Sequence, residues 1–165
     1  MQELTKKPMV DVLSEQLGRQ VVVSGDKYVY LDTKEEVEAS IAREAEIKNH
    51  NDFLQLLKDA KSKEINIACK NEIESGFVSN ALGAEHTYQS GQIDQLNLIG
   101  LVASGADDYF KADGEYKLHT AEQLQQVLND GRAYKQTLLQ KANILKRKIA
   151  AATTEEEIEE ISWEE

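Results

Sequence analysis

Residues 76–98, GFVSNALGAEHTYQSGQIDQLNL, decide how the rest of the chain is interpreted. Two alternating runs, one starting at Phe77 and one ending at Ser90, flank the sequence LGAE, which predicts a β-hairpin. Gly91 ends the second run. Asp94 then falls in the first turn or at the N-cap of a predicted helix, where the helix dipole favours a carboxylate.

The same segment holds the three residue types of a hydrolytic triad, in Ser79, His86 and Asp94. A triad is defined by geometry and roles rather than by composition. The segment also lacks the G-x-S-x-G elbow that presents a nucleophilic serine in α/β-hydrolases. We therefore interpret the cluster as scaffold, with Phe77 or Tyr88 packing inward and His86 hydrogen-bonded. No catalytic residue is predicted.

No metal or cofactor site is predicted either. The imidazoles are few and widely spaced: they are His50, His86 and His119. None has a second histidine at the i, i+4 spacing of a zinc helix, and the acidic segment 107–113 lacks the D-x-D-x-D-G pattern of a calcium loop. The single cysteine, Cys69, lies in an apolar-periodic run and is predicted to be a small buried hydrophobe. No P-loop and no G-x-G-x-x-G sequence occurs, so no nucleotide is expected.

The charge balance narrows the classes of partner. The 165 residues include 30 acidic and 19 basic side chains, for a formal net charge of -11. Such a surface repels phosphate backbones and anionic lipids, so binding to nucleic acid is not expected. No run approaches the roughly 18 apolar residues of a membrane span, so membrane insertion is not expected. The opening sequence MQELTKKPMVDVL lacks the apolar segment of a signal peptide. Protein partners with basic patches are predicted.

Periodicity predicts an α+β protein that is mainly helical with short β-hairpins. We divide it into an N-terminal helix and hairpin unit at 1–33, a connecting helix at 34–62 and a compact, mainly helical α+β domain at 63–165. In the first part, Gly18 ends a short helix and two β-rich runs flank a turn at 24–27. An isolated hairpin is barely stable in water, so this arm needs a partner surface.

The connecting segment predicts self-association. Thr33 and Glu36 have the spacing of a capping box, which predicts a helix from 34 onward, and KNHND at 48–52 predicts a break in it. The apolar residues form a narrow stripe among charges, and they are Val37, Ile41, Ala45 and Ile47. A thin stripe on a charged helix is typical of coiled coils, so we predict a symmetric homo-oligomer, a trimer by preference.

The remaining elements follow from caps and turns. Apolar spacing predicts a helix over 53–74 that Gly76 ends, and Asp113-Gly114 predicts the turn of a second hairpin. Thr120 then caps a long helix, in which Gly131 predicts a kink or a close contact. Caps at Thr153 and Thr154 predict a last short helix with Ile158, Ile161 and Trp163 on one side.

Interaction residues are predicted on the N-terminal arm, along the apolar stripe and at the C-terminus. They are Val21, Val23, Tyr28, Tyr30, Val37, Ile41 and Trp163. Trp163, the only tryptophan, has two interpretations, an anchor on its own domain or a hot spot for a partner.

Residues 63–163 resemble a known family. The similarity lies in KSKEINIACKNEIESGF, in the H-x-Y-x-S and DQ-N-L elements of 86–98, in LHTAEQLQQVLNDG, and in the ending AATTEEEIEEISW. Together these segments resemble a domain of unknown function found in bacteriophage tail proteins and usually encoded beside tail fibres. That family brings no catalytic residues with it.

The resemblance implies a structural virion protein. We expect a tail-fibre or baseplate component that acts in fibre attachment or host adhesion. It would bind phage tail or fibre proteins, and would lie in the virion tail and, during assembly, in the host cytoplasm. A tail-fibre assembly chaperone, absent from the mature virion, is the alternative. An enzyme acting on host polysaccharide is disfavoured, since no carboxylate pair stands in a recognisable setting.

Overall fold

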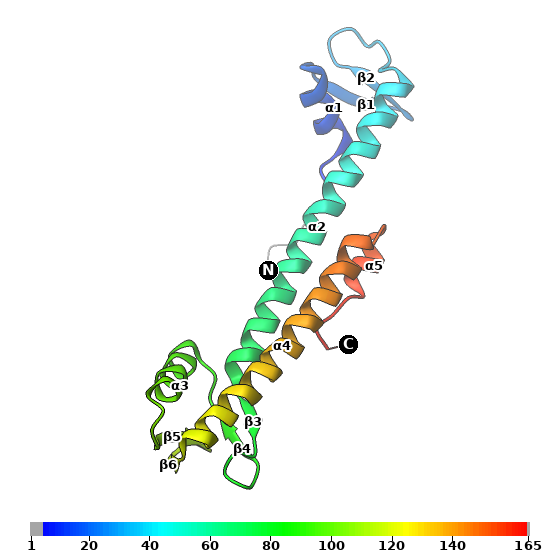
Figure 1. Ribbon diagram of the computed structural model, residues 1–165. Coiled ribbons are helices and arrows are strands. Elements are labelled where there is room, and N and C mark those ends of the chain that lie inside the picture. Colours follow the sequence, from blue (N-terminus) through cyan, green and yellow to red (C-terminus); the bar gives the residue numbers. More distant parts are fainter. Residues whose placement is uncertain (1–4, 165) are drawn as a thin grey trace. The chain divides into compact units, whose positions relative to one another are not determined.

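The structure, a computed structural model, describes residues 5–164. The chain forms two units, one of Met1–Lys61 with Ala152–Glu159 and the other of Ser62–Ala151 with Glu160–Glu165. As expected, it is an α+β protein in which helices dominate. In the described residues the strands form two-stranded antiparallel sheets, β1–β2, β3–β4 and β5–β6 (Figure 1). No helix in this part of the chain combines the length and apolar character that a bilayer span requires.

The first unit is built on a hairpin beside a helix. Its N-terminal elements are α1 (Met9–Leu17), β1 (Val21–Ser24) and β2 (Lys27–Tyr30). The predicted hairpin is confirmed, and its ladder pairs Val21 with Tyr30. Leu13 of α1 is fully buried in a core that it forms with Val21, Val37 and Ala45. The Ser14 hydroxyl accepts the Val21 N–H at 2.9 Å, which joins helix to sheet.

The predicted start of the connecting helix is wrong. Helix α2 (Ala39–Ser75) begins six residues after Thr33, because the intervening residues pair with β2. Glu36 forms a bridge with Val29, and the Val37 N–H donates to the Tyr28 carbonyl at 2.8 Å. These backbone bonds with β2 replace the first helical turn, and Val37 therefore lies outside the helix.

The predicted break at 48–52 is also wrong, since α2 continues through KNHND. Asn49 is buried, and its Nδ2 donates to the Lys7 carbonyl at 2.8 Å. Polar residues disfavour a helix interior when they compete for its backbone. Here the amide is satisfied elsewhere in the first unit, so the helix is not interrupted.

A short C-terminal helix completes the first unit. Helix α5 (Glu155–Glu159) carries Ile158 into a small core with Leu54 and Ala152. Its predicted cap is confirmed: the Glu157 N–H donates to Thr154 Oγ1 at 3.2 Å, and Glu157 Oε2 accepts the Thr153 N–H at 2.6 Å. The helix ends at Glu159, so the prediction that Ile158, Ile161 and Trp163 share one helical side is wrong.

The second unit has two cores. In the first, the last part of α2 packs antiparallel to α4 (Ala121–Ala151), as Figure 1 shows. Its buried side chains recur at helical spacing: Ile65, Cys69, Ile73, Leu138, Ala142, Leu145 and Ile149, with Ile161. Burial of each large aliphatic side chain here stabilises the fold by about 1.5–3 kcal/mol. Cys69 is buried as predicted, and burial raises the pKa of its thiol.

The second core is aromatic and lies among the hairpins. The remaining elements are β3 (Phe77–Ser79), β4 (His86–Tyr88), α3 (Gln92–Ser104), β5 (Asp108–Ala112) and β6 (Glu115–His119). Tyr88 is fully buried between Phe77 and Phe110, with ring centroids 5.8 and 6.1 Å away. Both predicted hairpins are confirmed. The second turns through Asp113 and Gly114, which have φ values of 53° and 81°.

Two glycines permit close approaches in this unit. Gly76 ends α2 with a φ of 115°, and a Cβ there would lie 2.7 Å from the Tyr88 carbonyl oxygen. Gly131 lies in the interior of α4, where a Cβ would lie 2.7 Å from Cζ of the buried Phe77 ring. Of the two sequence alternatives for Gly131, the close contact is confirmed.

Replacing Gly131 with alanine is expected to destabilise the protein by about 1–3 kcal/mol, because the added methyl overpacks the Phe77 ring. The matched control is Gly100→Ala in α3, where an added Cβ meets no atom within 4 Å. That change should stabilise by up to about 1 kcal/mol through helix propensity alone. Urea unfolding measures both. Shifts of the same sign in the two variants would contradict the packing that we describe.

Candidate functional site

The polar side chains noted in residues 76–98 do not converge on one site. They make hydrogen bonds to different parts of the structure. Ser79 and His86 are cross-strand partners in the β3–β4 ladder. The Ser79 hydroxyl nevertheless donates to Asp130 Oδ2 at 2.6 Å, and the His86 Nδ1–H donates to Asp113 Oδ2 at 2.5 Å. The serine and the imidazole thus bind different carboxylates, and the structure does not bring Asp94 to either of them.

Asp113 joins the two hairpins of the second unit. Its N–H donates to the Thr87 carbonyl at 2.8 Å, and its Oδ1 accepts the Thr87 N–H at 2.8 Å. Its other oxygen also accepts from Lys117 Nζ at 3.1 Å. Lys117 Nζ is 3.2 Å from His86 Nδ1 as well. Because that nitrogen already donates to the carboxylate, we assign the lysine's hydrogen bond to Asp113. The hydrogen bonds from His86, Thr87 and Lys117 lower the pKa of Asp113.

A buried tyrosine–histidine pair fixes the aromatic core. The His119 Nδ1–H donates to the Lys117 carbonyl at 2.8 Å, which leaves Nε2 as an acceptor. The Tyr88 hydroxyl donates to that nitrogen at 2.9 Å. Burial, aided by the charges of Asp113 and Asp130, raises the pKa of Tyr88 to about 12. Both side chains are fully buried, so this bond is structural.

The geometry offers no support for nucleophilic catalysis by the cluster. An attacking hydroxyl must be reached by its substrate and must donate to its base. Ser79 is only 3% exposed and donates to a carboxylate. In residues 5–164, no group of three or more histidine, cysteine, aspartate or glutamate side chains could hold a metal ion. In the acidic segment, Asp107 caps α4 by accepting the Ala121 N–H at 2.9 Å.

Most predicted interaction residues of the N-terminal arm belong to the core of the first unit. Val21 and Val37 are buried there, so neither presents a surface to a partner. Tyr28, Tyr30 and Ile41 are partly buried and pack on the same core. Val23 alone of this set is exposed, at 59%. The stripe that suggested a coiled coil is thus largely covered by the first unit itself.

Trp163 is an anchor within its own unit. Its indole N–H donates to the Glu72 carboxylate, and Lys141 Nζ lies 4.8 Å from the ring centroid. The ring is partly buried and packs on the core between α2 and α4. Of the two interpretations of Trp163, the anchor on its own domain therefore agrees with its position.

Sequence reasoning missed an exposed apolar surface on α3. Ile93, Leu96 and Ile99 are 74%, 69% and 52% exposed. Leu98 of the same helix is buried. A helix that is apolar on every side is normally covered on every side. The signal was present in the sequence, because QIDQLNLIGLVAS contains one charged residue in a chain that is 30% charged.

The outer side of the β5–β6 hairpin continues this surface. The ladder pairs Tyr109 with Leu118 and Lys111 with Tyr116, which places the four side chains on one side of the hairpin. A groove of about 390 Å³ lies between this hairpin and α3, and Leu96, Tyr109 and Tyr116 are among its lining residues. We call the exposed apolar residues on this side the α3–hairpin face: they are Ile93, Leu96, Tyr109, Tyr116 and Leu118.

Comparison with known families places this surface in a defined domain. The sequence model of one family, described as a domain of unknown function (DUF4376), matches residues 56–162, well over half of the chain. The chain belongs to this family. The match confirms the domain of unknown function noted from the sequence, and the association with phage tails stays a prediction. No curated protein and no solved structure is significantly similar to the chain.

The stability of the protein should fall in acid partly through Asp113. Its pKa is lowered in the folded state, so its stabilising contribution is present above the ordinary carboxyl pKa of about 3.9 and is lost as the pH falls below it. Asp113→Asn keeps an acceptor for Thr87 and tolerates the positive φ, but it removes the charge. The variant should be less stable than the wild type at pH 7, and the difference should shrink toward pH 2.

Asp113→Ala is the companion variant, since it also removes the acceptor for the Thr87 N–H. At pH 7 we expect the order of stability wild type, then Asn, then Ala. Urea unfolding from pH 7 to pH 2 measures this order. A wild-type minus Asn difference that does not change with pH would show that the charge has no role.

Proposed function

We propose that the protein is a structural bacteriophage tail component, attached to a tail fibre or baseplate, that acts by binding other tail proteins in fibre attachment or host adhesion. It would lie in the virion tail and, during assembly, in the host cytoplasm. Two lines support the proposal. The family segments of the sequence resemble domains of phage tail proteins, and the polar cluster is engaged in bonds that fold the hairpins. We accordingly propose no enzymatic role.

The α3–hairpin face carries the proposal. Its five apolar side chains are each at least 56% exposed. Exposed apolar area costs about 25 cal/mol per Å², so exposed apolar side chains that share a groove, as Leu96, Tyr109 and Tyr116 do, commonly mark a protein-binding surface. Two tyrosines at the groove suit such a role, since tyrosine is enriched where partners bind. The whole face lies within the residues that the family model matches.

The predicted homo-oligomer rests on a different part of the chain from the proposed partner binding. The trimer was predicted from the stripe at 34–47. Of those residues, only Ile47 keeps substantial apolar exposure, at 53%, and it is a narrow base for a coiled coil. We therefore assign partner binding to the α3–hairpin face and keep the homo-oligomer as a prediction.

The assembly chaperone remains the second candidate. The formal net charge of -11 favours a soluble helper that covers an aggregation-prone fibre segment and then leaves it. Such a helper would use the same apolar face, so location in the finished particle separates the two functions.

Quantitative mass spectrometry of purified particles should find the chain in a fixed ratio to the other tail proteins. A component is retained because its interface is part of the particle. Absence, or a ratio that falls with each purification step, would favour the chaperone and contradict the structural role.

Leu96→Asp and Tyr116→Asp should each weaken association with other tail proteins, since each places a carboxylate in a surface that must be desolvated. Gln89→Asp, at an exposed position outside the face, is the matched control and should bind as the wild type does. The readout is co-purification from infected cells, with unfolding curves to confirm that each variant is folded. Equal recovery of all three variants would contradict the assignment.

Light scattering on the isolated protein separates a second copy from a different partner. A mass that the Asp variants reduce to that of one chain would place self-association on the same face. A monomeric wild type at every concentration would contradict the predicted trimer.

A further inference from the structure

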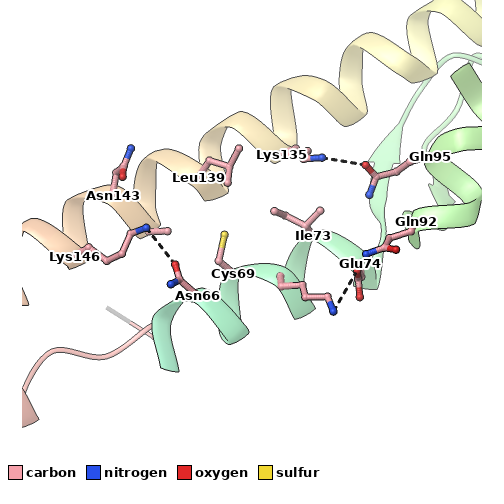
Figure 2. A pocket seen from close by; sticks show the side chains of 12 residues that line it. Asn66, Cys69, Ile73, Glu74, Gln92, Gln95, Lys135, Leu139, Asn143 and Lys146 are labelled. Carbon is pink, nitrogen blue, oxygen red and sulfur yellow. Dashed lines mark hydrogen bonds and ion pairs between the residues drawn. The ribbon is translucent and has the colours of Figure 1, made fainter. Parts of the chain in front are cut away.

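A groove on the second unit differs in character from the rest of the molecule. It lies between the last part of α2 and the middle of α4, with the start of α3 at one end, and has a volume of about 500 Å³. Figure 2 shows Lys146 and Lys135 extending from α4 toward the opposite wall, with Cys69, Ile73 and Leu139 between them. We call it the lysine groove.

The groove is positively charged in an acidic protein. Its charged lining residues are Lys70, Lys135, Lys146 and Glu74, three positive and one negative, for a net charge of +2. The whole chain carries -11. A positive groove on an acidic chain attracts an anionic ligand that the remaining surface would repel.

Two of the lysines bind only neutral groups. Lys135 Nζ donates to Gln95 Oε1 at 3.1 Å, and Lys146 Nζ donates to Asn66 Oδ1 at 3.2 Å (Figure 2). Within the described residues neither ammonium has a carboxylate in ion-pair range, whereas Lys70 lies 4.0 Å from Glu74. Both amide oxygens could be replaced by an incoming carboxylate, which is the stronger acceptor.

The spacing of the two lysines sets the size of the ligand. They are eleven residues apart on α4, about three turns and about 16 Å along the helix, and so lie on nearly the same side. An extended peptide advances about 3.3 Å per residue, so roughly five residues span this distance. A single small anion could reach only one of the two ammonium groups.

The uncharged lining residues of the groove suit a peptide better than a ligand that carries charges alone. The amide side chains that line the groove both donate and accept, as a peptide backbone does: they are Asn66, Gln92, Gln95 and Asn143. The apolar lining, which can receive apolar side chains, consists of Cys69, Ile73, Leu139 and Ala142. Figure 2 shows the amide of Asn66 on α2, across from α4, and the amide of Gln95 on α3 at the end of the groove.

The chain's own acidic segment does not supply this peptide. The sequence EEEIEEISWE at 155–164 carries the required charges. However, its apolar residues are already placed: Ile158 and Ile161 are buried, and Trp163 binds Glu72. A second copy would hold its own segment in the same way.

We propose that the lysine groove binds an extended acidic peptide segment of a partner protein, about five residues long. Carboxylates at its two ends replace the amide partners of Lys135 and Lys146, and apolar side chains between them contact the floor. The proposal deepens the proposed function, and rests on it only in that the partner would be a tail protein. The chemistry of the groove stands apart from that identity.

Fluorescence anisotropy with the full chain and two labelled peptides tests the proposal. The probe is Glu-Ala-Leu-Ala-Glu, and its uncharged match is Gln-Ala-Leu-Ala-Gln. We expect saturable binding of the first and at least tenfold weaker binding of the second. The affinity of the first should fall as salt is raised, because the contacts are partly exposed ion pairs. Equal binding of both peptides, or no binding of either, would overturn the proposal.

Variants locate the binding in the groove. Lys135→Gln and Lys146→Gln should each raise the Kd roughly fivefold, the size of one partly exposed charge contact. Asn143→Glu, which adds a carboxylate to the wall, should weaken binding as well. Lys63→Gln, on α2 outside the groove, is the matched control and should leave the Kd unchanged. If the three groove variants bind like the wild type, the site is elsewhere and the proposal fails.

Two further outcomes are distinguishable. Tight binding of polygalacturonate without binding of the acidic peptide would overturn the peptide assignment in favour of an anionic polysaccharide. Peptide binding that behaves as expected, combined with absence of the chain from purified particles, would contradict the proposed virion role and support the groove. If the peptide assay fails and the chain is present in particles, the groove proposal is contradicted and the virion role is supported.

Discussion

The second unit depends on the burial of Tyr88. Its ring lies between Phe77 and Phe110 with no exposed surface, and its hydroxyl has one partner, the Nε2 of His119. A buried hydroxyl without a partner costs about 1–3 kcal/mol, so β6 must present His119 where β4 presents Tyr88. The Lys117 carbonyl holds the imidazole in the required tautomer. Two hairpins from different parts of the sequence are thereby placed against each other and against α4.

The same requirement explains why a chemically suggestive cluster serves the fold. A strand as short as β4 has few ladder bonds of its own. Asp113 adds two hydrogen bonds to the Thr87 backbone, one from its own N–H and one through its carboxylate, and its carboxylate also binds His86. Ser79 meanwhile ties β3 to Asp130 of α4. Each polar group is thus hydrogen-bonded at the join between two elements, where it holds the fold together.

The surface divides by physical character rather than by position in the sequence. The α3–hairpin face is mainly apolar, with the opposite charges of Asp94 and Lys111 beside its groove, so it suits a partner that buries apolar area. The lysine groove is positive and lined by amides, so it suits an acidic strand of chain. Both lie within the family domain, where the proposed tail function would need its contacts. In the first unit, by contrast, apolar residues are buried in a small core of its own.

Residue patterns alone identified the mainly helical α+β class, the three hairpins, the caps at Thr120 and Thr154, and the buried state of Cys69. These features depend on neighbours within a few positions, through turn geometry and periodic burial. Sequence placed the start of α2 too early because Glu36 and Val37 pair with β2, a contact between segments that local propensity does not describe. It likewise missed the lysine groove, because Lys135 and Lys146 meet their amide partners across 40 and 80 positions of sequence. Local spacing therefore determined which elements form. Only the tertiary structure decided which polar groups bind one another inside the fold and which line a groove, because that depends on contacts between distant segments.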